Sequence, residues 1–178
     1  MMADALPQHT MPEIEAAQSS HAFLCLGTNM GERVTILRHA LELLELAGVR
    51  ISARSSLYET PPWGPIPQEP YLNQVVEVET TLSPRALLEL ALRVERTLGR
   101  DRAREVRYGP RRIDIDILLF DSQDFRHADL ELPHPRILER AFVLVPLTEI
   151  APDITIAGTR AADALAELDA SDIRPFAL

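Results

Sequence analysis

Two carboxylates stand inside one of the most hydrophobic stretches of the chain, the segment GPRRIDIDILLFD that runs from Gly109 to Asp121. In a β-strand, successive side chains point to opposite faces, so Asp114 and Asp116 share one face and lie roughly 7 Å apart. The opposite face then carries Ile113, Ile115, Ile117 and Leu119. Carboxylates held this close repel each other unless a cation lies between them, and buried charges must be paired or bind metal.

The segment before this strand, from Arg100 to Arg112, contains six arginines. We expect it to create a local positive field beside the two acids. Polyphosphate bound to Mg²⁺ needs both kinds of group, because hard oxygen ligands hold the metal and arginines pair with the remaining phosphate charge. Two alternatives stay open. The arginines can form a solvated charged face, or they can form only structural salt bridges with Asp114 and Asp116.

Other candidate ligands lie in or beside the predicted loops. Asn73 follows a proline-rich loop, and its amide offers donors and an acceptor to a heterocycle. Aromatic side chains that can stack on such a ring are Trp63, Tyr108 and Phe142. His134 is either a phosphate donor or a structural histidine, and Arg140 is a further phosphate candidate. The sequence contains no P-loop, no kinase glycine-rich loop and no zinc-type spacing of Cys and His.

Hydrophobic periodicity predicts the elements that must bring these residues together. In chain order we expect a strand, a helix, two strands, a second helix and the two-aspartate strand, over residues 21–27, 33–47, 50–60, 71–80, 84–98 and 111–120. A loop with five prolines, residues 61–70, precedes the strand that carries Asn73. A helical turn, an apolar strand or helix segment and a short helix over residues 161–168 follow. This order predicts an α+β fold, a ferredoxin-like sandwich with an antiparallel sheet and helices packed on its face.

Composition bounds the function classes. With 178 residues, 46% of them hydrophobic, the chain fits one globular domain, expected at residues 22–178 after a flexible tail at residues 1–21. The net charge of −9 disfavours a general nucleic-acid binder. The single cysteine, Cys25, excludes an internal disulfide and favours the cytoplasm. No stretch reads as a signal peptide or a membrane span, so we expect no membrane partner.

Five segments resemble, in order and spacing, the 6-hydroxymethyl-7,8-dihydropterin pyrophosphokinases of folate biosynthesis. They are CLGTNMGER, SSLYETPPWGP, PYLNQVVEVET, LGRDRAREVRYGPRRIDIDILLF and LPHPRILERAFVLVPLTEIAPD, and they span Phe23 to Asp153. The resemblance implies transfer of pyrophosphate from ATP to the pterin hydroxymethyl group, with release of AMP. It also implies two Mg²⁺ ions held by Asp114 and Asp116. Weak association with neighbouring folate enzymes stays open.

The same resemblance implies site residues. The pterin would lie between Tyr108 and Phe142, within a set that comprises Thr60, Pro61, Trp63, Tyr71, Asn73, Tyr108 and Phe142. ATP would meet Leu88, Glu95, Arg100, Arg102, Arg111, Ile117, Leu130, His134 and Arg140. The catalytic group would be Arg102, Arg111, Asp114 and Asp116.

Four positions depart from the usual family pattern. Tyr108 replaces a tryptophan, Leu92 replaces a glutamine, and Asp129 and Glu131 replace an arginine and a threonine near the nucleotide. These changes affect individual ATP contacts and leave the metal pair intact. The alternative function is a ferredoxin-like module that binds RNA through the arginine segment, although the paired acids would repel a phosphate backbone.

Overall fold

The computed structural model describes residues 19–62, 65–106 and 108–177, and its strands and helices alternate in the expected order. The elements that form the sandwich are β1 (Ser20–Thr28), α1 (Arg33–Leu46), β2 (Arg50–Arg54), β3 (Tyr58–Thr60), β4 (Tyr71–Thr80), α2 (Pro84–Thr97) and β5 (Asp114–Phe120). After them come β6 (Phe125–His127), β7 (Leu130–Leu132), a 3-10 turn (Ile137–Glu139), α3 (Ala141–Ile150), β8 (Thr155–Ile156), β9 (Thr159–Arg160), α4 (Ala161–Ala166) and β10 (Arg174–Pro175).

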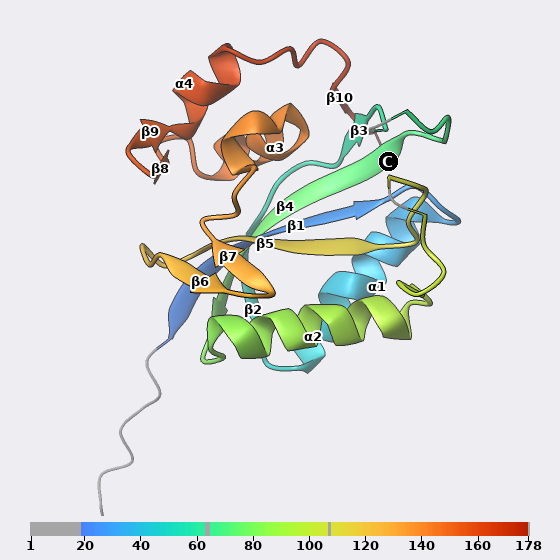
Figure 1. Ribbon diagram of the computed structural model, residues 1–178, viewed down its shortest axis with the longest axis horizontal. Coiled ribbons are helices and arrows are strands. Elements are labelled where there is room, and N and C mark those ends of the chain that lie inside the picture. The colour runs from blue at the N-terminus through green and yellow to red at the C-terminus, as the bar shows by residue number, and fades with distance from the viewer. Residues whose placement is uncertain (1–18, 63–64, 107, 178) are drawn as a thin grey trace, which may run out of the picture.

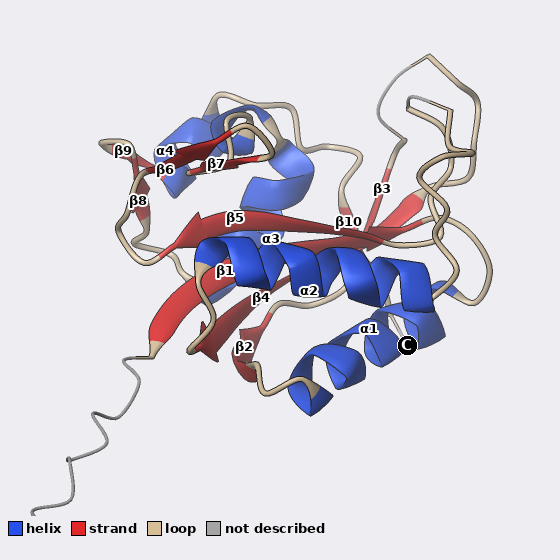
Figure 2. Cartoon of the chain, turned by 60° about the horizontal axis from the view of Figure 1, so that its bottom comes forward, coloured by secondary structure: helices blue, strands red, loops and turns tan. Residues whose placement is uncertain are grey.

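The main sheet is antiparallel, with neighbouring strands in the order β10-β3-β4-β1-β5 and with β2 paired to β4. Helices α1 and α2 lie on one face of this sheet, and α3 with α4 lies on the other (Figure 1). Figure 2 shows α1 and α2 side by side beneath the strands. The predicted α+β sandwich with the ferredoxin-like element order is therefore confirmed.

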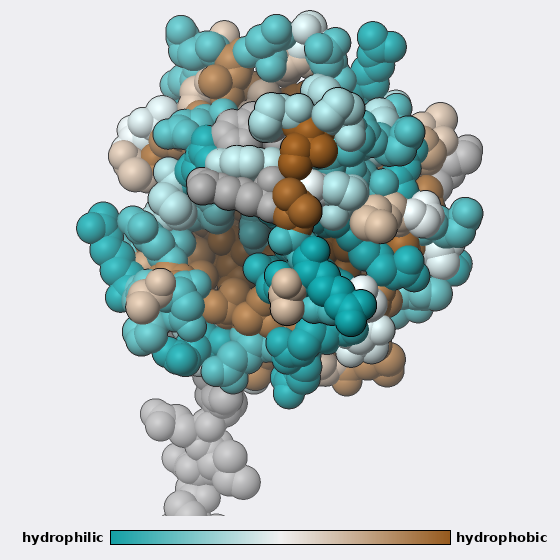
Figure 3. Space-filling model, turned by 45° about the vertical axis from the view of Figure 1, so that its right-hand side comes forward, coloured by the Kyte–Doolittle hydropathy of each residue, from teal (hydrophilic) through white to brown (hydrophobic). Residues whose placement is uncertain are grey.

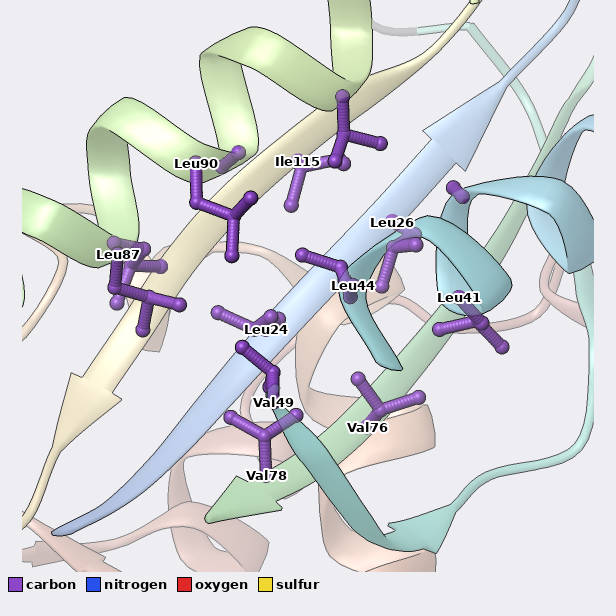
Figure 4. Close-up of a cluster of buried hydrophobic side chains, with 14 of the residues drawn as sticks. Leu24, Leu26, Leu41, Leu44, Val49, Val76, Val78, Leu87, Leu90 and Ile115 are labelled. Atoms are coloured by element: carbon purple, nitrogen blue, oxygen red, sulfur yellow. The ribbon is translucent and has the colours of Figure 1, made fainter. Parts of the chain in front are cut away.

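The larger core cluster fills the space between the sheet and the helices α1 and α2. Leu24, Leu26, Val76 and Val78 point from the sheet toward Leu41 and Leu44 of α1 and Leu87 and Leu90 of α2 (Figure 4). Strand β4 alternates between the two faces of the sheet, because Leu72, Val76 and Val78 belong to this cluster while Val75 packs on the opposite face. Helix α2 begins at Pro84, as predicted, and the side chain of Ser83 before it accepts a hydrogen bond from the backbone N–H of Ala86.

The second cluster packs α3 on the opposite face of the sheet. Cys25, Val75 and Leu118 from the strands contact Val143, Leu144 and Leu147 of the helix. The sequence allowed either a strand or a helix here, and the structure has a helix. Because α3 covers only part of this face, the remaining part is open to the loops that precede β4 and β5.

Two details of the sheet differ from the prediction. Leu119 does not share a face with Ile113, Ile115 and Ile117, because a bulge falls between the pairs Leu24–Ile117 and Phe23–Leu119 and turns Leu119 toward the second cluster, to which Leu118 also belongs. The single strand predicted over residues 50–60 is two strands, β2 and β3. Between them, Ser55 leaves the ladder and its hydroxyl accepts the backbone N–H of Val75 at 3.0 Å.

The predicted tail lies mostly outside the described residues, and β1 begins at Ser20. The division into a tail and one domain stays a prediction, as does a cytoplasmic location. Among the helices of the described ranges, none has the length and apolar character to cross a lipid bilayer.

Candidate active site

One cavity opens on the α3 side of the sheet, where β1, β4 and β5 lie side by side. The strand register places Asn73, Gly27 and Asp114 in one row across these three strands, with Cys25 and Asp116 paired farther along. The cavity is lined by Cys25, Gly27, Thr60, Pro61, Tyr71, Asn73, Tyr108, Gly109, Arg111, Asp114, Asp116, Arg140 and Phe142. The structure therefore brings together both acids and six of the seven residues expected around the pterin. Trp63, the seventh, lies outside the described residues.

Asn73 is one of two buried polar side chains that the sequence predicted for the pterin part of this cavity; it is 4% exposed, and Thr60 is 2% exposed. Its Nδ2 donates a hydrogen bond to Thr60 Oγ1 at 2.7 Å. An amide has two donor hydrogens and an acceptor oxygen, so this bond fixes its orientation and uses only one of its groups.

Gly27 was not predicted as a site residue. A Cβ atom at this position would lie 2.5 Å from Asn73 Oδ1, which is far inside van der Waals contact. Only glycine therefore lets the Asn73 amide lie across β1. The only signal in the sequence is the glycine of CLGTN itself, because glycine permits the close approach of another group to the backbone.

The two acids have different partners. Asp114 accepts hydrogen bonds from Arg111 and, at 2.5 Å, from Arg100. Asp116 is 3.3 Å from Nη1 of Arg140. Burial raises the pKa of Asp116 to about 6, and the charge of Asp114 adds to the shift. Burial acts on Asp114 in the same direction, but Arg111 and Arg100 outweigh it and hold its pKa below the usual range.

Glu95, on α2, forms ion pairs with Arg100 and Arg102. Its carboxylate is 1% exposed and accepts hydrogen bonds from Arg100 at 2.7 Å, from Arg102 at 2.8 Å and from the backbone N–H of Ile115 at 2.9 Å. The Ile115 contact ties Glu95 to β5 between the two acids. Glu95 therefore holds Arg100 against Asp114 and keeps the end of α2 next to the site.

The positive field expected from the arginine segment is largely neutralised in this structure. Besides the pairs with Glu95 and Asp114, Arg104 lies 3.2 Å from Asp101, and Arg112 donates to the carbonyl of Leu98 at 2.5 Å. This arrangement gives no support to the RNA-binding alternative, because the arginines face carboxylates and carbonyls of their own chain. It does show the salt bridges that the structural alternative predicts for a site without ligand.

The proline loop and the arginine segment contact each other over the cavity. Asn29, 5% exposed, donates to Gln68 and accepts the backbone N–H of Arg111 at 2.8 Å. Gln68 in turn donates to the carbonyl of Tyr108 at 2.7 Å, and the Tyr71 hydroxyl donates to the carbonyl of Gly109 at 3.1 Å. Asn29 is a second residue that the sequence analysis missed, since it reads only as a turn former.

The residues expected around ATP fall into three places. Leu88, Ile117 and Leu130 all belong to or pack against the core cluster between α2 and β5. Glu95, Arg100 and Arg102 line a separate recess together with Leu92. Arg111 and Arg140 line the main cavity. The face seen in Figure 3 is mostly hydrophilic, with hydrophobic side chains visible inside its recesses.

His134 lies just after β7. Its backbone N–H donates to the carbonyl of Leu118 at 2.8 Å, and its Nδ1 accepts the backbone N–H of Arg136 at 3.2 Å. Burial, followed by the charge of Arg140, lowers the pKa of His134 to about 4. The imidazole is therefore neutral at pH 7, with Nδ1 as the acceptor and Nε2 as the donor.

Comparisons with known proteins agree with this geometry. The model of the 7,8-dihydro-6-hydroxymethylpterin-pyrophosphokinase (HPPK) family matches residues 23–152. A relative from Methylorubrum extorquens, named 2-amino-4-hydroxy-6-hydroxymethyldihydropteridine pyrophosphokinase, is 48% identical over 155 residues, which cover 86% of this chain and 97% of the relative. A relative of the same name from Bacillus subtilis is 47% identical over 141 residues, covering 79% of this chain and 83% of the relative.

Solved structures show the same fold. The wild-type HPPK-DHPS of Plasmodium falciparum with SDX-DHP superposes with a TM-score of 0.67 at 17% identity, over 86% of this chain. The present chain spans 45% of that longer one. From the matched residues and the two relatives, the chain belongs to the 7,8-dihydro-6-hydroxymethylpterin-pyrophosphokinase family.

Proposed function

We propose that the cavity binds 6-hydroxymethyl-7,8-dihydropterin beside ATP, and that the chain transfers pyrophosphate from ATP to the pterin and releases AMP, as its family does in folate biosynthesis. The observation that carries the proposal is that one cavity contains both the hydrogen-bonded side chains of Thr60 and Asn73 and the carboxylates of Asp114 and Asp116. An oriented amide suits a heterocycle, and paired carboxylates suit a metal-bound polyphosphate.

The pterin would occupy the part of the cavity next to β4. Asn73 and Thr60 would hydrogen-bond its polar edge, with Pro61 and Tyr71 beside it, and Tyr108 and Phe142 would stack on its two faces. A site built to hydrogen-bond a heterocycle discriminates strongly against rings that leave its buried groups unpaired. This arrangement would turn the hydroxymethyl group toward β5.

The metal proposal fits the donor set. Asp114 and Asp116 supply hard oxygen ligands on one face of one strand. Burial, followed by the charge of Asp114, raises the pKa of Asp116, and a cation between the two acids would favour the ionised form of both. Magnesium is commonly bound by one or two carboxylates together with substrate phosphates. We propose two Mg²⁺ ions, which when bound would neutralise phosphate charge and order the triphosphate.

The arginines would exchange partners when the substrates bind. In the structure, Arg100, Arg111 and Arg140 pair with the two acids. Cations on the acids would free these guanidinium groups to pair with phosphate oxygens, for which their planar geometry is suited. Arg102 would join them from the recess beside α2, and neutral His134 would donate from Nε2. Leu88, Glu95, Ile117 and Leu130 would lie near the nucleotide.

The reaction would consist of one in-line displacement. The pterin hydroxymethyl oxygen forms a bond to the β-phosphorus and loses its proton, while the bond from that phosphorus to the α-β bridging oxygen breaks and AMP leaves. The chain would contribute by holding the hydroxyl in line and by placing Arg102 and Arg111 against the charge that develops on the phosphate oxygens. Closure of the loops over the site would exclude water from the phosphorus.

The nucleotide product tests this proposal. The protein is incubated with Mg²⁺, ATP and the reduced hydroxymethylpterin, and the nucleotides are separated by chromatography. AMP that forms only when pterin is present supports pyrophosphoryl transfer. ADP as the sole product would mean an ordinary kinase and would refute the proposal.

Two further expectations concern partners and location. A relative from Pisum sativum named folate synthesis bifunctional protein, mitochondrial, is 39% identical over 146 residues, and this chain covers 28% of it. Because some relatives belong to longer folate-synthesis chains, we propose weak association of this chain with neighbouring folate enzymes. The cytoplasm remains the compartment that the sequence predicts.

A further inference from the structure

Arg33, the first residue of α1, contacts three segments that are far apart in the sequence. Its Nη1 donates to the carbonyl of Pro70 at 2.8 Å, and its Nη2 donates to Glu59 Oε2 at 2.7 Å. Its guanidinium carbon lies 5.5 Å from the centre of the Phe176 ring. The side chain is 24% exposed, so these contacts are partly shielded from water.

Each contact lies next to the proposed pterin site. Pro70 precedes Tyr71, and Glu59 precedes Thr60, and both of these following residues line the main cavity. Thr60 and Tyr71 also face each other in the ladder between β3 and β4. Arg33 therefore binds the backbone of the residue that precedes β4 and the side chain of Glu59 in β3, and each of these lies one residue from the cavity wall.

The third contact brings in the C-terminal segment. In Figure 1, β10 lies beside β3 at the edge of the sheet. The ladder pairs Arg174 with Glu59, and the backbone N–H of Phe176 donates to the carbonyl of Leu57 at 2.8 Å. Strand β3 has three residues and is too short to be stable alone, so β10 and Phe176 hold it from outside. The family match ends at residue 152, before this segment begins.

The residues that precede β10 also line a second recess, which adjoins the proposed pterin site. Leu168, Asp169, Asp172 and Ile173 line it from the C-terminal segment. The recess shares four wall residues with the main cavity, namely Thr60, Pro61, Arg140 and Phe142. The C-terminal segment thus lies against the outer side of the wall whose inner side faces the pterin.

We propose that Arg33 is a positioning residue for the pterin site: it clamps the C-terminal strand, β3 and the end of the proline loop together and so fixes the Thr60–Asn73 pair. This inference rests on the proposed function for its effect on the pterin. Arginine suits the role because its planar fork directs two N–H groups to two acceptors while its face stacks on a ring.

The first test compares ligand affinities by calorimetry. Arg33→Met keeps the apolar stem and removes the guanidinium, and Arg38→Met is the matched control, since Arg38 lies on the same helix, is 64% exposed and pairs only with Glu42 in the ion pairs of the described residues. Arg33→Met should raise the pterin Kd about fivefold, the loss expected for one or two positioning contacts, and leave the ATP Kd unchanged. Arg38→Met should change neither.

A second variant covers the case in which Arg33→Met does not fold. Glu59→Gln keeps the shape of the acceptor and removes its charge, and it should raise the pterin Kd about threefold. An unchanged pterin Kd in the folded variants overturns the proposal. An equal loss of ATP affinity also overturns it, because a merely structural role weakens both ligands.

Hydrogen exchange separates this inference from the function on which it rests. In the ligand-free protein, amides of residues 58–60 should exchange at least about fivefold faster in Arg33→Met than in wild type, while those of β1 keep their rates. Equal exchange at residues 58–60 overturns the clamp even if the wild type makes AMP. A wild type that makes no AMP refutes the proposed function even if the exchange rates change as expected.

Discussion

The same residue type behaves in two ways within one strand. Asp114 and Asp116 are two positions apart on β5, yet one has a lowered pKa and the other a raised pKa. Burial raises the pKa of both carboxyl groups, so their opposite net shifts come from their different charged neighbours. Two arginines bond to Asp114, whereas Asp116 has Arg140 at a longer distance. On this strand, Asp114 is therefore held in its ionised form by arginines, whereas Asp116 still lacks the full positive charge that a bound cation would supply.

Gly27→Ala should weaken pterin binding. The added methyl would lie 2.5 Å from Asn73 Oδ1, so the amide or the strand must move. Overpacking of this kind typically amounts to 1–3 kcal/mol, and we expect about a tenfold rise in the pterin Kd. Titration of ATP alone serves as the control and should be unaffected. Normal pterin affinity in this variant would show that the Asn73 amide is not the recognition group.

His134→Asn should change how stability depends on pH. The ordinary pKa of histidine is 6.5, and in the folded protein it falls to about 4. The folded state therefore takes up the proton less readily than the unfolded state, and the wild type loses stability as pH falls from 6.5 toward 4, by at most about 1.4 kcal/mol per pH unit. Asparagine keeps an acceptor near Nδ1 and does not titrate.

Urea denaturation of both proteins at pH 7 and pH 5 checks this expectation. The loss of unfolding free energy between the two values should be smaller for His134→Asn than for wild type. Equal losses would mean that the imidazole is not held neutral by its surroundings.

At the scale of elements, α2 and β5 are joined through one buried acid. Glu95 is in the last turn of α2 and accepts a hydrogen bond from the backbone N–H of Ile115, and the same carboxylate pairs with Arg100 and Arg102. A helix face, a strand and the arginine segment therefore meet at a single side chain. Breaking such a buried pair leaves an uncompensated charge, which is strongly destabilising.

Glu95→Gln should lower the free energy of unfolding by about 3 kcal/mol, because Arg100 stays buried with fewer anionic partners. Glu89→Gln is the matched control on the same helix. Glu89 lies 3.5 Å from Arg85 at 66% exposure, and its loss should matter by at most about 0.5 kcal/mol. Chemical denaturation measures both. Similar small effects for the two variants would show that Glu95 does not hold the site together.

The sequence predicted the local features of these elements and missed the long-range ones. The bounds of α1, α2 and β4 depend on nearby residues, and the structure matches the predicted ranges to within one residue. The bulge that turns Leu119 depends on the register between β5 and β1, which no local pattern in β5 encodes. The bridge made by Asn29 is missed for a similar reason, since its partners lie in loops distant in the sequence.

In the site, too, local features were predicted from the sequence and long-range contacts were not. Asp114, Asp116 and Asn73 were identified from their types and spacing, and the cavity unites them. The close approach of Gly27 to Asn73 depends on the register between β1 and β4, and the pairing of β10 with β3 depends on the register between those two strands. Roles toward the pterin and ATP came from family resemblance, and those residue roles stay predictions.

Across the whole molecule, the net charge is negative, although the proposed substrate ATP is itself an anion. The chain carries a net charge of −9, and the arginines of the site are engaged by its own carboxylates. If ATP binds these arginines as proposed, it has to compete with internal acids for the guanidinium groups. A cation that occupies the acids removes this competition, so nucleotide and metal should bind together.

Removal of the metal tests that coupling. In the presence of a chelator, ATP should bind at least about tenfold more weakly than with Mg²⁺, since each 1.4 kcal/mol of lost electrostatic stabilisation is a factor of ten. Calorimetry of ATP with and without the chelator gives the ratio. In Asp114→Asn, where one competing acid is neutral, the ratio should be smaller. Equal ATP affinity in both conditions would show that the acids and the metal do not act on the nucleotide.

The paired acids of β5 should be required for pyrophosphoryl transfer, and a single-turnover assay measures this requirement. Wild type, Asp114→Asn and Asp116→Asn are mixed with Mg²⁺, ATP and the reduced hydroxymethylpterin, and AMP and pterin diphosphate are quantified over time. We predict equal amounts of the two products from wild type and, in either variant, a rate lower by about 10³ or more with the fold retained, because metal-assisted charge stabilisation supplies several kcal/mol. A variant that forms AMP at nearly the wild-type rate would contradict the claim.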